Sequence, residues 1–405
     1  YIYTSGTTGR SKAAVFSHTR FIGAGVTWAR AMQLVPTDVF YVTLPLYHGN
    51  GGCVAVSAVL RSRCSLVLRQ KFSVRAFLPD VRAYGATATI YIGELWRYLY
   101  NTPGSPDDAV NPLRVACGNG LRGDIWRSVV ERFGLSLIVE HYGQTEMPSA
   151  HPMINSHNVV GSCGFIPPNV LGKLGTECLI RFDIDANAPE RDENGHCIRC
   201  GPGQEGESIV RLADGQYRGY TSDAATDKAM YRNVFEEGDV WYHSGDLLRF
   251  DHDGYFFFVD RVGDSFRWKG ENVATGEVCE AVGSFAGIAE ANVYGVSVPG
   301  TEGRAGMASV VPTSSPLDVD GLAQHIAPLL PAYARPLFLR VAAPGQQHEK
   351  TSTFKFKKSE AQAAGFNPSA CAPDQVYFRD DAQGGRFVPV DPELYARLSS
   401  GVTRL

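Results

Sequence analysis

The chain has 405 residues, of which 44% are hydrophobic, 20% charged and 11% aromatic. These proportions are typical of a globular protein and exclude a collagen, a coiled coil and a largely disordered chain. Lys and Arg total 38 and Asp and Glu total 42, so the net charge of −4 offers no sign of a nucleic-acid-binding protein. At roughly 150 residues per domain, the length predicts two to three domains.

The chain begins at Tyr1, without a methionine, inside the apolar run Tyr1-Ile2-Tyr3. This beginning predicts a piece of a longer protein that is cut within a strand. We expect such a fragment, expressed alone, to be poorly soluble or inactive.

The first part of the chain alternates short β-rich runs with helical patterns. We expect strands over residues 1–4, 13–17, 39–44, 65–68, 87–92 and 137–141. Helices are expected between them, over residues 20–34, 74–84, 94–100 and 122–133. This alternation, with strands that are almost continuously apolar, predicts a parallel sheet covered on both faces. Ligands of such sheets bind at the carboxyl ends of the strands.

From about residue 155 the pattern changes, because Pro, Gly and polar residues separate short strands such as 177–182 and 207–211. This pattern predicts a mostly antiparallel β region. A strongly apolar strand over 255–259 then leads into a compact set of elements. These are a helix over 274–285, strands over 289–296 and 307–311, a helix over 318–330 and a strand over 337–341. We predict a domain boundary and hinge near residues 260–264, where Gly263, beside Asp264, can absorb large changes in its backbone dihedral angles.

The cysteines and the longest apolar stretch bear on the compartment of the protein. Nine cysteines, an odd number at low density, favour reduced thiols and a cytosol-facing protein. Cys197 and Cys200 form one C-x-x-C pair beside His196, but a zinc site needs a second ligand pair, so a loop with two thiols is predicted. The stretch from Gly51 to Leu60 is too short for the ~18 residues of a membrane span.

The first motif is the run from Thr4 to Lys12, which reads T-S-G-T-T-G-R-S-K and lies between two expected strands. Hydroxyl groups and backbone N–H groups in a glycine-rich turn can bind phosphate oxygens, and Lys12 adds positive charge. The spacing is not that of a Walker A loop, and a strand follows it instead of a helix. Taken alone, the motif predicts a phosphate site, with a structural turn as the alternative.

The stretch from Tyr3 to Gly9 resembles the signature loop of the adenylate-forming superfamily, which contains acyl-CoA synthetases, luciferases and peptide-synthetase adenylation domains. Three further motifs follow in the order of that superfamily: 142–146 (Y-G-Q-T-E), 242–246 (Y-H-S-G-D) and 350–355, which ends at Lys355. The sequence departs from the usual pattern at three positions. Ser11 stands where the superfamily has Pro, Ser244 where it has Thr, and Ser352 where relatives often have Gly.

The segment 260–273, which reads D-R-V-G-D-S-F-R-W-K-G-E-N-V, resembles one branch in particular. It is similar to the diagnostic segment of the fatty-acid transport protein / very-long-chain acyl-CoA synthetase family, as are 91–95, 294–307 and 333–336. The resemblance covers essentially the whole chain. It implies an α/β fold in which residues 1–260 are part of a large AMP-binding domain, with parallel sheets and a β region. Residues 261–405 would then form a small α+β lid domain.

The resemblance also implies a reaction, that of an AMP-forming acid–thiol ligase. The carboxylate of a long- or very-long-chain fatty acid attacks the α-phosphate of ATP, which gives an acyl-adenylate and pyrophosphate. Coenzyme A then attacks the acyl carbonyl, which gives a thioester and AMP. The implied cofactors are ATP and Mg²⁺, with coenzyme A as co-substrate, and nucleic acid is not an expected partner.

Two alternatives stay open beside long-chain fatty-acid activation. One is a bile-acid or branched-acid CoA ligase of the same branch, and the other is a fatty-acid uptake protein that does not need ligation. The branch further implies a cytosol-facing protein at a membrane surface of the endoplasmic reticulum, peroxisome or plasma membrane, bound through a region upstream of Tyr1.

Roles for individual residues follow from the same resemblance. The ATP phosphates would be held by Thr4, Ser5, Gly6, Thr7, Thr8, Gly9 and Lys12. Glu146 has the hard oxygen atoms that Mg²⁺ prefers and would bind it, while Thr145 would donate to the α-phosphate. Adenine would lie between Tyr142 on one side and Gly118, Asn119 and Gly120 on the other.

The remaining roles concern the ribose, the transition state and the acyl region. Asp246, assisted by Arg261, would accept hydrogen bonds from the ribose hydroxyls. Lys355 would offset the charge that accumulates during adenylation, although Lys355, Lys357 and Lys358 could also form a solvated basic patch. His48 and Gly270 would lie in the acyl and CoA region, with a packed structural histidine as the alternative for His48. The small domain would rotate about Gly263 and Asp264, exchanging Lys355 for the segment near Gly270.

Overall fold

The computed structural model describes residues 1–4, 12–148, 153–171, 173, 177–212, 219–313, 316–350, 356 and 358–400. Their contacts form two compact units. The first contains Tyr1–Arg181, Pro189–Ser244 and Leu248–Phe258, and the second contains Phe182–Ala188, Gly245–Leu247 and Val259–Leu405. The lid domain, its boundary near residues 260–264 and its movement stay predictions.

A six-stranded sheet lies at the centre of the first unit, in the order β4-β3-β5-β6-β7-β8. Its members are β4 (Ser65–Leu68), β3 (Val39–Val42), β5 (Ala88–Ile92), β6 (Val115–Asn119), β7 (Leu137–Tyr142) and β8 (Met153–Asn155). The first five strands run parallel, and β8 pairs antiparallel with β7. The predicted α/β fold with a parallel sheet is therefore confirmed. The strand β6 was not expected, because Arg114 and Gly118 leave it only a short apolar run.

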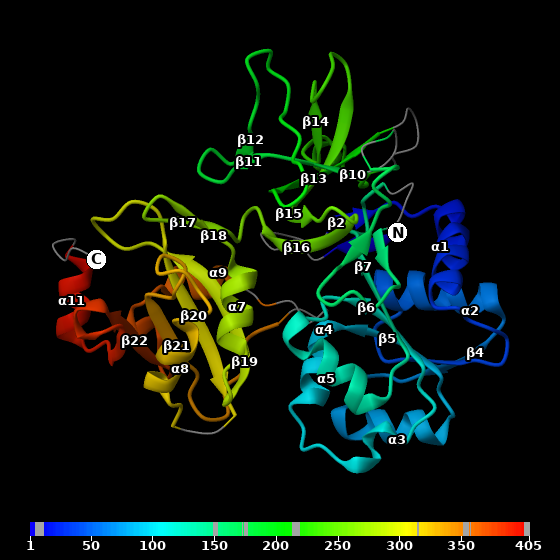
Figure 1. Ribbon diagram of the computed structural model, residues 1–405, viewed down its shortest axis with the longest axis horizontal. Helices are drawn as coiled ribbons and strands as arrows, with labels where there is room; N and C mark the ends of the chain where they lie inside the picture. The colour runs from blue at the N-terminus through cyan, green and yellow to red at the C-terminus, as the bar shows by residue number, and fades with distance from the viewer. Residues whose placement is uncertain are drawn as a thin grey trace. The chain divides into compact units, whose positions relative to one another are not determined.

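Helices cover both faces of this sheet (Figure 1). On one face, α3 (Val74–Ala83), α4 (Gly93–Tyr100) and α5 (Gly123–Phe133) share a hydrophobic core with strand residues such as Tyr41 and Ile138. On the other face, the ring of Trp28 on α1 (His18–Ala31) lies 4.6 Å from the ring of His141 on β7. Successive strand residues point to opposite faces, so His141 faces α1 while its neighbour Glu140 faces α4 and α5.

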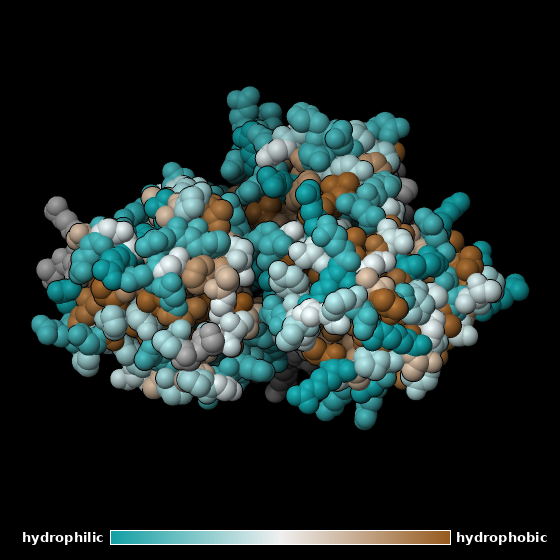
Figure 2. Space-filling view, turned by 60° about the horizontal axis from the view of Figure 1, so that its bottom comes forward, coloured by the Kyte–Doolittle hydropathy of each residue, from teal (hydrophilic) through white to brown (hydrophobic). Residues whose placement is uncertain are grey.

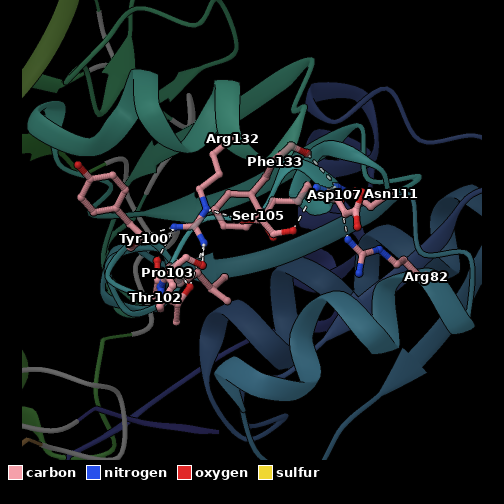
Figure 3. A network of polar contacts seen from close by, with 11 residues as sticks. Arg82, Tyr100, Thr102, Pro103, Ser105, Asp107, Asn111, Arg132 and Phe133 are labelled. Carbon is pink, nitrogen blue, oxygen red and sulfur yellow. Dashed lines mark hydrogen bonds and ion pairs between the residues drawn. The ribbon is translucent and has the colours of Figure 1, made fainter.

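The loop between α4 and β6 is fixed by arginines from two neighbouring helices (Figure 3). Arg132 on α5 donates from Nε to Asp108 at 2.7 Å and also reaches the backbone carbonyls of Tyr100, Thr102 and Pro103. Arg82 on α3 donates to the carbonyls of Asp107 and Val110. Planar guanidinium groups can satisfy several carbonyls at once, so this network holds the helical layer behind β5 and β6 in place.

Two strands expected at the start of the alternation lie outside the parallel sheet. The strands β1 (Ile2–Thr4) and β2 (Lys12–Ala14) pair antiparallel with each other, with Thr4 opposite Lys12. Seven residues separate them, and a parallel crossover needs about a dozen or more. The short connection therefore requires the antiparallel pairing.

Residues 49–62 form two helical elements that the sequence did not predict, namely the π-helix η1 (Gly49–Ala55) and α2 (Val56–Ser62). The Gly-rich start of η1 is typical of a turn, so the sequence pattern did not indicate a helix there. The glycines are needed for close approach. A Cβ on Gly51 would lie 2.4 Å from the carbonyl oxygen of Pro45, and a Cβ on Gly52 would lie 2.1 Å from that of Leu46.

The second large sheet is the predicted antiparallel β region, in the order β10-β13-β15-β16-β9 with β14 beside β15. Its strands are β10 (Glu177–Ile180), β13 (Glu205–Arg211), β15 (Val240–Phe250), β16 (Tyr255–Arg261), β9 (Gly164–Phe165) and β14 (Met230–Arg232). The pairs β10–β13, β14–β15 and β9–β16 are antiparallel. The shorter elements nearby are η2 (Pro106–Ala109), β11 (Phe182–Asp183), β12 (Ala188–Pro189) and α6 (Asp223–Asp227).

The second unit is built on a five-stranded sheet in the order β19-β20-β21-β22-β23. Its strands are β19 (Ile288–Val296), β20 (Ala305–Pro312), β21 (Phe338–Val341), β22 (Gln375–Asp380) and β23 (Arg386–Pro389). The helices of this unit are α7 (Thr275–Gly283), α8 (Val319–Ile326), α9 (Lys358–Ala364), α10 (Pro368–Cys371) and α11 (Pro392–Ser399), with a 3-10 turn η3 (Asp381–Gln383). Apolar residues from both layers form one core.

Among the described residues, no helix has the length and the apolar character that crossing a membrane requires. On the face in Figure 2, hydrophobic side chains lie among hydrophilic ones. All nine cysteines are buried free thiols.

Candidate active site

Thr4 and Lys12 occupy facing positions at the ends of β1 and β2, and residues 5–11 connect them. Ser5, Gly6, Thr7, Thr8 and Gly9 lie outside the described residues, so their phosphate role stays a prediction. Lys12 is exposed, and its Nζ lies 5.3 Å from the centre of the Tyr220 ring. An ammonium at this distance from an aromatic ring is attracted to the ring by a cation–π interaction.

The same tyrosine contacts the residue predicted to bind Mg²⁺. The hydroxyl of Tyr220 donates a hydrogen bond to Oε1 of Glu146. Tyr220 also pairs with Ala14 in an isolated β-bridge, which fixes it beside β2. The predicted phosphate-binding Lys12 and the predicted metal ligand Glu146 therefore both contact the side chain of Tyr220. No pattern in the sequence singles out Tyr220.

His48, which was predicted to lie in the acyl region, is close to the segment 142–146. A Cβ placed on Gly49 would come 3.7 Å from the Oγ1 of Thr145. His48 is the N-cap residue of η1 and directly precedes this glycine. The start of the π-helix therefore adjoins the segment 142–146, and π-helices often occur at functional sites.

Gln144 joins two of the sequence motifs within the first unit. Its Nε2 donates to the carbonyl of Ser244 at 2.7 Å, and its Oε1 accepts from the hydroxyl of Tyr242. The middle of the segment 142–146 is thus fixed to the start of the segment 242–246. Sequence reasoning missed this role, because position 144 varies within the motif.

The predicted walls of the adenine site follow the carboxyl ends of two neighbouring strands. Tyr142 ends β7, and Gly118 and Asn119 end β6. A Cβ on Gly118 would lie 2.3 Å from the carbonyl oxygen of Tyr91, and Gly120 has a φ of +81°. Both positions therefore require glycine. Oδ1 of Asn119 accepts from Nδ2 of Asn50 on η1 at 2.7 Å, a contact that the sequence did not predict.

Asp246, the predicted ribose ligand, belongs to the second unit. Its side chain is buried, and its Oδ1 lies 3.7 Å from the Nε of Arg261. This separation is an ion pair and too long for a hydrogen bond. Asp246 and Arg261 are therefore neighbours, as their predicted shared role requires.

The predicted hinge contains a buried carboxylate, Asp260, that accepts hydrogen bonds from Ser265 and Thr275 at 2.9 Å each. Asp264 forms an ion pair with Lys358 at 3.0 Å. Gly263 is exposed, and an added Cβ there would meet nothing within 4 Å. No steric contact in this conformation therefore requires glycine at residue 263. The hinge role of Gly263 and Asp264 stays a prediction.

Gly270 and Lys355 were both predicted to serve the active site from the second unit. Gly270 lies in the two-residue turn between β17 (Phe266–Trp268) and β18 (Glu271–Val273), where Lys269 and Gly270 have φ of +52° and +84°. Such values are typical of a type I′ hairpin turn. Lys355 and Lys357 lie outside the described residues. Lys358 is held by Asp264 and Thr275, which argues against a solvated basic patch at that position.

Buried charges hold the described residues on either side of 351–355. Lys350 and Phe356 form a β-bridge, and the Nζ of Lys350 lies 2.6 Å from Oε1 of Glu290 on β19. Nδ1 of His348 lies 3.4 Å from the other oxygen of Glu290. Burial raises the pKa of Glu290, but the contacts from His348 and Lys350 outweigh it and hold the pKa below its usual range.

The described residues offer few ligands for a metal ion. Among the described residues, no group of three or more His, Cys, Asp or Glu is placed to hold a metal ion. Mg²⁺ in nucleotide sites commonly uses one or two carboxylates together with phosphate oxygens. A single carboxylate such as Glu146 therefore fits an ion that the nucleotide itself brings.

Comparison with known families and proteins agrees with the motifs. Residues 1–182 match the AMP-binding enzyme family, and residues 277–355 match the AMP-binding enzyme C-terminal domain. The chain is 42% identical to long-chain fatty acid transport protein 2 of Rattus norvegicus, over 100% of this chain and 64% of that protein. It is 40% identical to long-chain fatty acid transport protein 1 of Mus musculus, over 99% of this chain and 62% of that protein. The chain therefore spans about three-fifths of the length of these curated relatives.

Solved structures share the fold at lower identity. ATP-bound MatB from Rhodopseudomonas palustris superposes with a TM-score of 0.72 at 22% identity, covering 89% of this chain and 67% of that chain. The o-succinylbenzoate CoA synthetase of Bacillus subtilis, in complex with ATP and magnesium ion, gives a TM-score of 0.67 at 22% identity, covering 89% and 68%. From the family matches and these relatives, the chain belongs to the AMP-binding enzymes, in the branch of the long-chain fatty acid transport proteins.

Proposed function

We propose that this chain carries the nucleotide-binding part and the lid of an AMP-forming acyl-CoA synthetase. The observation that carries the proposal is the contact of Lys12 and Glu146 with one tyrosine, Tyr220. A cation and a carboxylate at one place suit the phosphates of a nucleotide and the Mg²⁺ that accompanies them.

The first half-reaction joins the fatty acid to AMP. A carboxylate oxygen of the acid forms a bond to the α-phosphorus, and the bond from that phosphorus to the bridging oxygen of pyrophosphate breaks. Lys12 holds the departing phosphates, and Thr145 donates to the α-phosphate. Glu146 would hold the Mg²⁺, which neutralises negative charge on the phosphates. Catalysis of this kind is mainly positioning and charge stabilisation.

Other residues hold the nucleoside and complete the charge balance. Tyr142 and the segment 118–120 enclose adenine, and Asp246 with Arg261 binds the ribose. Lys355 stabilises the transition state of adenylation from the lid, residues 261–405. In the second half-reaction the lid rotates about Gly263 and Asp264, and the thiol of coenzyme A attacks the acyl carbonyl with AMP as the leaving group.

The acid is a long-chain fatty acid in this proposal. The names of the relatives, long-chain fatty acid transport proteins, support this substrate. The same names equally support a role in fatty-acid uptake at a membrane. Uptake and ligation are compatible if the ligation of the fatty acid is coupled to its uptake. A bile-acid or branched-acid CoA ligase is distinguished by comparing these acids as substrates.

The test is a Lys355→Ala variant of the full-length protein, with Lys357→Ala as the matched control. We expect ATP-dependent acyl-CoA formation to fall ~10²–10³-fold for Lys355→Ala, because one preorganised charge is lost, and to change little for the control. Fatty-acid uptake is measured on the same variants. Unchanged thioester formation in Lys355→Ala would overturn the mechanism, and loss of ligation with intact uptake would favour an uptake protein that does not need ligation.

A further inference from the structure

The strand β7 carries a carboxyl group in the interior of the first unit. The residue Glu140 is 2% exposed and faces the helices α4 and α5. Its Oε1 accepts from the backbone N–H of Leu121 at 3.0 Å, and its Oε2 pairs with the hydroxyl of Tyr91 on β5. The backbone N–H of Gly120 also donates to this carboxyl. Its three partners are all neutral groups, which is unusual for a buried glutamate.

The surroundings favour the protonated form of this carboxyl. Burial raises the pKa of Glu140 to about 8, and the hydrogen bonds from Tyr91, Leu121 and Gly120 reduce that rise without cancelling it. A protonated carboxyl can still accept from Leu121 through one oxygen and share a hydrogen bond with Tyr91 through the other. The contacts of this carboxyl with Leu121 and Tyr91 therefore do not require a buried charge.

The partners of Glu140 belong to the loop that follows β6. This loop is packed tightly on its other side, since a Cβ on Gly93 at the start of α4 would lie 1.7 Å from the carbonyl oxygen of Gly120. A Cβ on Gly118 would likewise lie only 2.3 Å from the carbonyl oxygen of Tyr91. The N–H groups of Gly120 and Leu121 would have no place in a helix or strand ladder, and the Glu140 carboxyl supplies their acceptor.

Glu140 thus connects two segments that the proposed function assigns to adenine. It precedes Tyr142 by two residues on the same strand, and its carboxyl holds the backbone of the segment 118–121. The carboxyl can fix the separation between the ring of Tyr142 and the backbone of Gly118 to Gly120. A hydrophobic residue there could fill the space but could not hold the loop.

We propose that Glu140 is a positioning residue of the nucleotide site, which sets the width of the adenine slot by anchoring the loop after β6 to the strand that carries Tyr142. This inference rests on the proposed function for the location of adenine. It assigns no contact between Glu140 and the nucleotide.

The test compares three variants of the full-length protein by calorimetric titration with ATP, without fatty acid or coenzyme A. Glu140→Ala removes the acceptor, and Glu140→Gln retains a carbonyl oxygen for Leu121 and an amide that can donate to Tyr91. Ile138→Ala is the control, because Ile138 is fully buried two residues before Glu140 on the same strand and pairs with Ala116, not with the end of β6. Thermal unfolding shows whether each variant is folded.

We expect Glu140→Ala to raise the Kd for ATP by about tenfold or more, since the freed N–H groups let the loop move. Glu140→Gln should stay within about threefold of the parent protein, and Ile138→Ala should lose stability with little change in Kd. In steady-state kinetics, Glu140→Ala should raise the KM for ATP and leave the KM for the fatty acid unchanged. If Glu140→Ala does not fold, Tyr91→Phe takes its place. This variant removes one hydroxyl that pairs with Glu140, so its Kd for ATP should rise, but by less.

Equal ATP affinity in Glu140→Ala and the parent protein would overturn the proposal. An equal loss of affinity in Ile138→Ala would also overturn it, because general destabilisation would then explain the effect. Failure of the parent protein to bind ATP would instead overturn the proposed function, so the two failures are distinguishable.

Discussion

The ammonium of Lys350 lies 2.6 Å from a carboxylate oxygen of Glu290, and the two side chains are only 11% and 8% exposed. This pair connects β19 to the residue that precedes 351–355, and the β-bridge from Lys350 to Phe356 holds the residue that follows. The predicted catalytic Lys355 therefore belongs to a segment whose two described neighbours are fixed to the core of the second unit.

Breaking this pair should impair both stability and adenylation. We expect Glu290→Ala to lower the free energy of unfolding by about 3 kcal/mol, because it leaves a buried ammonium without its partner. The double variant Glu290→Leu/Lys350→Met should regain much of that loss, since it removes both charges. Denaturant unfolding gives the stabilities, and ATP–pyrophosphate exchange gives the adenylation rate. A Glu290→Ala protein with parental stability would show that the pair contributes nothing.

Asp246 and Arg261 should determine how the site recognises ribose. If the Asp246 carboxylate accepts from the ribose hydroxyls, the protein should prefer ATP to 2′-deoxy-ATP, and Asp246→Asn should weaken ATP binding by about 10- to 100-fold. Asp246→Asn should also discriminate less between the two nucleotides. Asp253→Asn, at an exposed turn, is the control. The ribose role is refuted if Asp246→Asn discriminates as strongly as the parent protein.

His243 should make the stability of the first unit depend on pH. Its Nδ1 lies 3.0 Å from Oε1 of Glu207, and its Nε2 lies 2.8 Å from the carbonyl oxygen of Lys228. Both partners are acceptors, so the doubly protonated ring satisfies them best. Burial lowers the pKa of His243, but the contacts with Glu207 and the Lys228 carbonyl outweigh it and raise the pKa above its usual value.

The sign of the effect follows from this shift. A histidine whose pKa is raised by folding contributes its full stabilisation below the unfolded value of about 6.5 and loses it as the pH rises through the folded value. The free energy of unfolding should therefore fall above about pH 6.5, by at most about 1.4 kcal/mol per pH unit from this group. His243→Gln should flatten that fall, whereas His252→Gln, at an exposed turn, should not. An unchanged slope in His243→Gln would assign the pH dependence to other groups.

The sequence predicted the elements whose pattern is long and regular. The helix α5 and the strand β7 were expected almost within their observed bounds, because their apolar residues recur at helical spacing in one and form a continuous run in the other. The π-helix η1 was missed, because glycines such as Gly51 are there for close packing, which no local pattern reveals.

The candidate site was predictable only where it is made by motif residues. Lys12 and Glu146 could be named from the sequence, but Tyr220, which contacts both, is distant along the chain from both. Glu140 was passed over for a similar reason. Its partners Tyr91 and Leu121 come from other elements, and a glutamate inside an apolar strand shows its role only when the loop beside it is seen.

The central claim, that the fatty acid is activated as an acyl-adenylate, is tested most directly by isotope transfer. The full-length protein is incubated with ATP, coenzyme A and a fatty acid whose carboxylate oxygens are ¹⁸O, and the AMP is analysed by mass spectrometry. Attack of the carboxylate on the α-phosphorus, followed by attack of the thiol on the acyl carbonyl, leaves one labelled oxygen in each AMP. AMP without the label, or label found only in inorganic phosphate, would contradict the account.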